Sequence, residues 1–115
     1  MNKLDSVYLF HVRDSINKIL EYTDISDVDS FQSNSMMQDA VIRQIEIIGE
    51  AIKNISEELK NKYKEIEWKE IIGTRDKMIH DYFGIDLDII WEITKKDILI
   101  LEKQIKKIKE DIERK

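Results

Sequence analysis

The residues with the clearest capacity for chemistry lie in one short segment. Arg75, Asp76, His80 and Tyr82 fall within eight consecutive positions, and a glycine stands on either side of them. A histidine with an ordinary pKa of ~6.5 can accept or donate a proton at cellular pH. An arginine offers a permanent charge and a planar set of donors that fit phosphate oxygens. The segment therefore predicts acid–base chemistry at a phosphate group.

Few other positions compete with this segment. His11, the other histidine, lies beside the apolar stripe of the first expected helix, and we interpret it as a structural or surface residue. The sequence has no cysteine and lacks the His-Glu-x-x-His and Glu-x-x-His patterns of metal enzymes. It also lacks a glycine-rich phosphate loop. The sequence thus predicts no metal, no cofactor and no binding of nucleoside triphosphate by the chain alone.

Length and composition indicate the kind of domain that carries the segment. The 115 residues suit one domain spanning 1–115, with 42% hydrophobic and 37% charged residues. This balance is too apolar for a disordered chain and too charged for a membrane span. The N-terminus shows no apolar leader. We expect a cytoplasmic protein with no membrane partner.

Helices are the expected elements. The sequence has no proline and three glycines, and its isoleucines recur at spacings of three and four. This pattern predicts an all-α, antiparallel bundle of four to five helices with short connections. The expected helical ranges are about 5–22, 35–60, 67–83 with an interruption at Gly73, and 86–115, with a polar loop over 23–30. Asp86 is expected to cap the last of them, whose apolar stripe includes Ile90, Trp91, Thr94 and Ile98.

The second expected helix has more apolar surface than one core face needs. Ile47 and Ala51 lie off its main stripe, which consists of Val41, Ile45, Ile48, Ile52, Ile55 and Leu59. Two interpretations are open. Either this helix is buried between two neighbours, or the additional surface is a homodimer contact.

Helical geometry makes a specific prediction about the candidate residues. Thr74 is expected to cap a helix that begins at Arg75, and Gly84 is expected to end it. At ~100° per residue, Arg75 and Tyr82 lie within about 20° of each other, whereas His80 lies roughly 140° from Arg75. A nearby two-fold axis would resolve this separation, because Arg75 and His80 of both copies could then line one cleft.

The span 75–82 resembles the motif of the HEPN-domain ribonucleases. In that motif an arginine precedes a polar residue, here Asp76, and a histidine follows after four intervening residues, here His80. Tyr82, two positions later, resembles the variant found in HepT toxins. The flanks 39–43, 46–51, 68–73 and 82–86, followed by Trp91, agree as well, so the similarity covers nearly the whole chain. One departure is that 64–67 lacks the proline of many relatives, which affects loop stiffness rather than chemistry.

The resemblance implies a HEPN-like homodimer that cleaves RNA without a metal, as the toxin of a type VII (HepT/MntA-like) toxin–antitoxin pair. His80 would be the general acid or base for the ribose 2′-hydroxyl and the leaving 5′-oxygen. Arg75 would stabilise the charged phosphorane. Asp76 would orient Arg75 or the RNA, which is a tRNA or an mRNA.

The resemblance also gives Tyr82 a second role. A cognate MntA-like nucleotidyltransferase antitoxin would attach AMP to its hydroxyl. The added phosphate beside Arg75 would then occupy the site meant for the RNA backbone. A simpler interpretation is that Tyr82 braces Arg75 or the dimer contact.

Net charge argues against an RNA-binding protein. Lys+Arg number 19 and Asp+Glu number 24, which gives −5, whereas RNA binding favours a basic surface. The local cations are Lys60, Lys62, Lys64, Lys69, Arg75, Lys77, Lys95 and Lys96. A basic patch of this kind can bind RNA on an otherwise acidic protein, so the net charge does not overturn the interpretation. The chief alternative is a non-catalytic helical subunit that binds a nucleotidyltransferase and presents Tyr82 or a substrate to it. An oligomerisation module without chemistry comes third.

Overall fold

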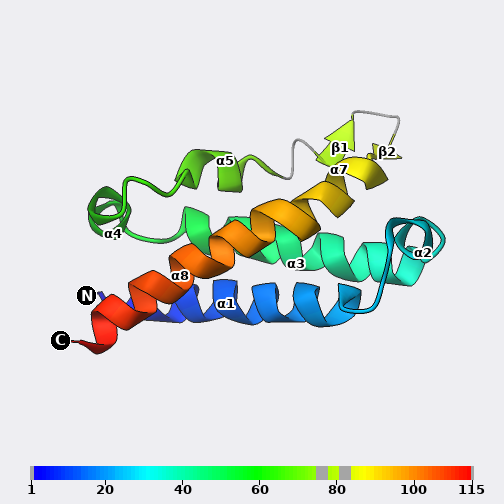
Figure 1. The fold of residues 1–115 in the computed structure, drawn as a ribbon. Coiled ribbons are helices and arrows are strands. Elements are labelled where there is room, and N and C mark those ends of the chain that lie inside the picture. The colour runs from blue at the N-terminus through cyan, green and yellow to red at the C-terminus, as the bar shows by residue number, and fades with distance from the viewer. Residues whose placement is uncertain (1, 75–77, 81–83, 115) are drawn as a thin grey trace.

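A computed structural model describes residues 2–74, 78–80 and 84–114. Two long helices, α1 (Lys3–Thr23) and α3 (Ser35–Lys53), lie side by side and run in opposite directions (Figure 1). The C-terminal helix α8 (Ile98–Glu113) crosses this pair, and α5 (Trp68–Ile72) packs on α3. The described chain is a helical bundle, so the all-α fold is confirmed.

Shorter elements connect the long helices. They are α2 (Val28–Gln32), α4 (Glu57–Lys62), the two-residue strands β1 (Ile79–His80) and β2 (Gly84–Ile85), α7 (Leu87–Glu92) and the π-helical turn η2 (Ile93–Asp97). Side-chain oxygens cap several helix starts and so satisfy backbone N–H groups that lack a partner within the helix. The predicted cap Asp86 is among them, since its carboxylate accepts hydrogen bonds from the backbone of Asp88 and Ile89.

The core follows the predicted apolar spacing. All six residues of the stripe expected for the second helix are buried. They pack in one cluster with the inner faces of α1 and α8, which include Val12, Ile16, Leu101 and Ile108. Burial of this shared cluster is the main term that stabilises the bundle.

The second helix does not extend to residue 60 as predicted. α3 ends at Lys53, and α4 begins at Glu57. Ser56 explains the break, because its hydroxyl caps α4 while its N–H and hydroxyl both donate to the carboxylate of Asp5 at 2.8 and 2.6 Å. These hydrogen bonds tie the start of α1 to the start of α4. In addition, the loop expected over 23–30 contains the start of α2, which Asp27 caps.

The final segment contains a feature that its spacing did not predict. The chain passes from α7 through η2 into α8 with helical backbone angles at each junction. A π turn takes one more residue than an α turn, and it therefore shifts the apolar stripe around the axis. As a result both Ile93 and Thr94 are buried, although only Thr94 belongs to the predicted stripe.

Candidate functional site

His80 is the one predicted site residue that lies within the described part of the chain, where its backbone forms β1. Arg75, Asp76 and Tyr82 lie outside the described residues, as does the start of the helix expected at Arg75. That helix was predicted to continue through His80, and this was wrong. The angle of roughly 140° between Arg75 and His80 therefore does not apply, because it assumes one continuous helix.

A small antiparallel hairpin holds the backbone of His80. Ile79 pairs with Ile85 and His80 pairs with Gly84. Gly84 has φ +87°, a conformation that glycine adopts without strain, so it was correctly singled out but serves the hairpin rather than a helix end. The backbone N–H of Asp86 donates to the carbonyl of Met78 at 3.0 Å, and the side chain of Met78 is fully buried. The hairpin thus joins the core on one side and the start of α7 on the other.

The approach to the site is fixed by Trp68. Its indole N–H donates to the carbonyls of Tyr63 at 3.0 Å and Lys60 at 3.2 Å, and its ring is buried. These hydrogen bonds hold α5 against the end of α4. Gly49 lies where α5 meets α3, and a Cβ atom there would stand 3.7 Å from the carbonyl oxygen of Ile72, so the two backbones pass close together. The last residues before the candidate segment are therefore firmly placed.

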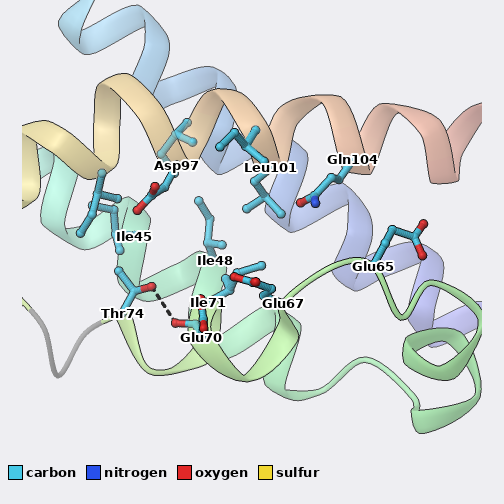
Figure 2. Close-up of a pocket in the computed structure, with 13 residues that line it drawn as sticks. Ile45, Ile48, Glu65, Glu67, Glu70, Ile71, Thr74, Asp97, Leu101 and Gln104 are labelled. Carbon is cyan, nitrogen blue, oxygen red and sulfur yellow. Dashed lines mark hydrogen bonds between the residues drawn. The ribbon is translucent and has the colours of Figure 1, made fainter.

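Thr74 lies just after α5, at the position predicted to cap the next helix. Its hydroxyl donates to the backbone carbonyl of Glu70 at 3.0 Å (Figure 2). It thus bonds back to the last turn of α5. The N–H groups that Thr74 was predicted to cap belong to residues outside the described part of the chain.

The exit from the site is held by an aromatic and cationic cluster. The ring of Trp91 lies 5.2 Å from that of Phe31 on α2, and the ammonium of Lys95 lies 4.7 Å from the centre of the Trp91 ring. Lys95 also donates to the carbonyl of Thr23 at the end of α1, at 3.1 Å. This cluster connects α7 and η2 to the ends of α1 and α2.

The local cations are only in part available to a phosphate backbone. Lys95 is engaged as described, and Lys60 lies 3.8 Å from Glu57 and 3.5 Å from the carbonyl of Lys53. Lys64, Lys69 and Lys96 are exposed. Of the predicted cations in the described part of the chain, Lys60 and Lys95 therefore make contacts within the protomer. Arg75 and Lys77 lie outside the described residues.

A cavity of about 360 Å³ opens beside Thr74, between α5 and α8 (Figure 2). Its floor is apolar, with Ile45, Ile48 and Leu101 among the residues that form it. Its rim carries four carboxylate side chains, which belong to Glu65, Glu67, Glu70 and Asp97. We call this cavity the acidic groove. No lysine or arginine lines it among the described residues, although Lys107 lies 3.9 Å from Glu65 at the rim. The remaining carboxylates oppose the approach of RNA phosphates from this side.

Sequence reasoning missed polar residues that fix the frame of the site. The hydroxyl of Tyr63 donates to the carboxylate of Asp111 at 2.8 Å. Desolvation by burial, together with this hydrogen bond, raises the pKa of Tyr63 to about 12. Asp5 and Lys95 are further cases, described above. Each links residues at least 48 positions apart. A regular spacing cannot reveal such pairs.

Three further observations concern metal ligands, membrane-spanning helices and His11. Within 2–74, 78–80 and 84–114, no group of three or more His, Cys, Asp and Glu side chains is placed to hold a metal. In the same part of the chain, no helix has the length and apolar content needed to cross a membrane. His11 is exposed, in edge contact with the rings of Tyr8 and Phe10, as expected for a surface residue.

Comparisons with known proteins place this fold in a family. The family model described as "Ribonuclease HepT-like" matches residues 12–108. A protein of Methanocaldococcus jannaschii named "Gamma-glutamylcyclotransferase and putative RNase" is 48% identical over 114 residues, covering 99% of this chain and 51% of that protein. The chain therefore spans about half the length of this relative.

Other relatives match over nearly their whole length. A "Putative RNase" of Caldanaerobacter subterraneus is 42% identical over 101 residues, covering 88% of this chain and 90% of that protein. The "Probable ribonuclease HepT" of Thermococcus cleftensis is 38% identical over 109 residues, covering 95% and 99%. No solved structure matches the chain significantly. On the strength of the family model and these relatives, the chain belongs to the HepT-like ribonuclease family.

Proposed function

We propose that this protein is a metal-independent endoribonuclease whose site is formed by Arg75 and His80. The observation that carries the proposal is the family match over 12–108, which includes the complete 75–82 motif. The names of relatives that match over their whole length point to the same activity. The hairpin adds support, since it fixes the backbone of His80 next to a buried methionine, as a catalytic group requires.

The proposed reaction is an internal transesterification. A base removes the proton of the ribose 2′-hydroxyl, whose oxygen attacks the adjacent phosphorus, while an acid protonates the leaving 5′-oxygen. His80 serves as base or acid, and in a dimer the two copies can divide these roles. Arg75 stabilises the charge on the phosphorane, and Asp76 orients Arg75 or the RNA. The products are a 2′,3′-cyclic phosphate and a 5′-hydroxyl.

A cleavage assay in EDTA tests the proposal. Purified protein, free of any partner, should cleave a tRNA or mRNA in the chelator and leave the two product ends named above. His80→Ala and Arg75→Ala should abolish cleavage, whereas His11→Ala should retain it. Equal cleavage by the wild type and His80→Ala would remove the proposed catalyst. Absence of cleavage in all preparations would favour the alternative, a non-catalytic subunit that presents Tyr82 or a substrate to a nucleotidyltransferase.

A homodimer belongs to the proposal, with the outer face of α3 as its contact. Ala51, one of the two residues expected there, is already buried within the protomer, while Ile47 is half-buried. Arg43 and Glu50 lie on either side of Ile47 and line the same cleft as it does. A two-fold axis at Ile47 would bring Arg43 of each copy to Glu50 of the other, which is a self-complementary arrangement.

Light scattering can test this dimer contact. Ile47→Asp should convert the dimer to monomers and abolish cleavage, because the cleft needs residues of both copies. Met36→Asp, at a residue that is 81% exposed on the same helix, is the control and should remain dimeric. A dimer that persists in Ile47→Asp would place the two-fold axis elsewhere.

The wider role in the proposal is that of a toxin in a type VII pair. A cognate MntA-like nucleotidyltransferase would transfer AMP from ATP to the Tyr82 hydroxyl and release pyrophosphate, which silences the nuclease. Mass spectrometry after co-expression with an adjacent nucleotidyltransferase should find adenylyl groups on Tyr82. Tyr82→Phe is the control and should stay unmodified and toxic. An unmodified Tyr82 in a neutralised complex would leave Tyr82 as a bracing residue.

A further inference from the structure

The outer surface of α1 carries an apolar ridge that the bundle does not cover. Leu4, Val7 and Phe10 are 60%, 43% and 66% exposed, and they follow one another at spacings of three. Side chains at this spacing form one of the natural ridges on a helix surface, which packs into grooves of other helices. Lys3 precedes the ridge and Arg13 continues it, both exposed. We call Leu4, Val7 and Phe10, with these two cations, the basic ridge.

The acidic groove has the complementary character. Ile100 lines it and is 51% exposed, so apolar surface continues from the floor to the lip. Figure 2 shows Asp97 entering from the η2–α8 side, while Glu70 and Thr74 lie on the opposite side. Its volume of about 360 Å³ is within the range of clefts that take up ligands or side chains.

Ridge and groove match in two independent respects. Both are apolar along the middle, and the charges that flank them are opposite. Lys3 and Arg13 are ten residues apart, hence ~15 Å along the helix, so the two cations lie at opposite ends of the ridge. Asp14, the neighbour of Arg13, is paired with Lys18 at 3.2 Å, so its negative charge is offset. A nucleic acid is a poor occupant of the groove, because both it and the rim are negative.

We propose that the basic ridge of one copy docks into the acidic groove of a second copy. No α1 residue lines the groove, so the contact joins two different surfaces and is heterologous. Each molecule then offers one ridge and one groove, and the assembly grows beyond a two-fold dimer into a ring or a chain. This inference goes beyond the proposed nuclease activity and does not depend on it.

Sedimentation of the full-length protein over a range of concentrations tests the apolar part of the contact. The wild type should form species larger than a dimer. Phe10→Asp and Ile100→Asp should each raise the concentration needed for them by about tenfold or more, because each removes a central apolar anchor. Ile25→Asp is the matched control, since Ile25 is fully exposed but lies in neither surface, and it should assemble as the wild type does.

Charge reversal tests the pairing itself. Glu65→Lys, Glu70→Lys and Asp97→Lys together make both surfaces positive, and Lys3→Glu with Arg13→Glu makes both negative, so neither variant should assemble alone. An equimolar mixture should regain assembly, because each ridge then finds a groove of opposite charge. Assembly of Phe10→Asp at wild-type concentrations would overturn the proposal. So would a mixture that fails to recover, or wild-type assembly that requires RNA or a second protein.

Discussion

α1 and α3 contain 21 and 19 residues, whereas the elements described between Trp68 and Glu92 contain six residues or fewer. The long pair is held by a continuous apolar interface, in which each turn supports the next. The short elements reach the same cluster through a few side chains, among them Trp68, Met78 and Ile90. Single hydrogen bonds, from the Trp68 indole and to the Asp86 cap, fix them further. The comparison teaches that stability and the candidate chemistry are assigned to different parts of the bundle.

The sharpest way to test this division is to remove the candidate catalyst. His80→Ala should lower the rate of RNA cleavage by about 10²- to 10⁴-fold, the range attributed to a positioned acid or base. The free energy of unfolding should change little, because the substitution touches no long helix. Cleavage rates and denaturant unfolding measure the two effects, with His11→Ala as the control that alters neither.

The complementary test changes a core residue of the long helix pair, α1 and α3. Ile52 is fully buried on α3, so Ile52→Ala should lower the free energy of unfolding by about 2–5 kcal/mol. Cleavage per folded molecule should be retained at temperatures where the variant is folded. Ile25→Ala, at a fully exposed position, should change stability by less than ~0.5 kcal/mol. A large loss of cleavage in folded Ile52→Ala would contradict the division of roles.

Trp68 joins the two regions, and its substitution should affect both. Trp68→Phe keeps most of the apolar ring but removes the donor to the carbonyls of Tyr63 and Lys60. Leaving these carbonyls without that donor should cost about 1–3 kcal/mol and slow cleavage as α5 loosens. Trp91→Phe is the comparison, because a phenylalanine still offers an aromatic face to Lys95. Trp91→Phe should therefore lower the free energy of unfolding by less than Trp68→Phe does, as measured by denaturant unfolding.

Two glycines near the site allow the cost of an unfavourable backbone conformation to be distinguished from the cost of steric contact. Gly84→Ala should destabilise by about 1–2 kcal/mol, since φ +87° is unfavourable for alanine although nothing lies within 4 Å of its Cβ. Gly73→Ala should be close to neutral, because Gly73 has φ −80° and a Cβ there meets the carbonyl of Lys69 at an ordinary 3.4 Å. Hydrogen exchange near β1 and cleavage rates would register the loss in Gly84→Ala. Equal behaviour of the two variants would exclude the hairpin described here.

The smallest expected effect concerns pH. The pKa of Tyr63 is raised to about 12 from 10.0, so the folded state holds this proton more tightly than the unfolded chain. The resulting stabilisation is complete below pH ~10 and is lost as pH rises toward ~12. Tyr63→Phe should remove this pH dependence and cost about 1 kcal/mol at neutral pH. The free energies of unfolding of the wild type and Tyr63→Phe, measured at pH 9 and 11, give the cost of the substitution and the pH dependence. Tyr22→Phe, at a surface position, is the control and should behave as the wild type.

Much of the bundle was within reach of sequence reasoning, because helices and cores depend on local periodicity. The stripe on α3, the cap at Asp86 and the surface position of His11 are all as expected. The motif at 75–82 and its flanks also identified the family that the comparisons show. Its assigned roles for Arg75, Asp76, His80 and Tyr82 stay predictions.

The elements that were predicted wrongly share one physical cause. The break after Lys53 depends on Asp5, and the hairpin at His80 depends on Gly84 and on the Asp86–Met78 bond. These partners come from other elements or from a chain reversal, and neither leaves a periodic signal. The sequence by itself determined which residues are apolar, capping or reactive, because these are properties of single side chains and short spacings. Only the tertiary structure decided where helices stop and which charges surround the groove, because those depend on contacts between distant segments.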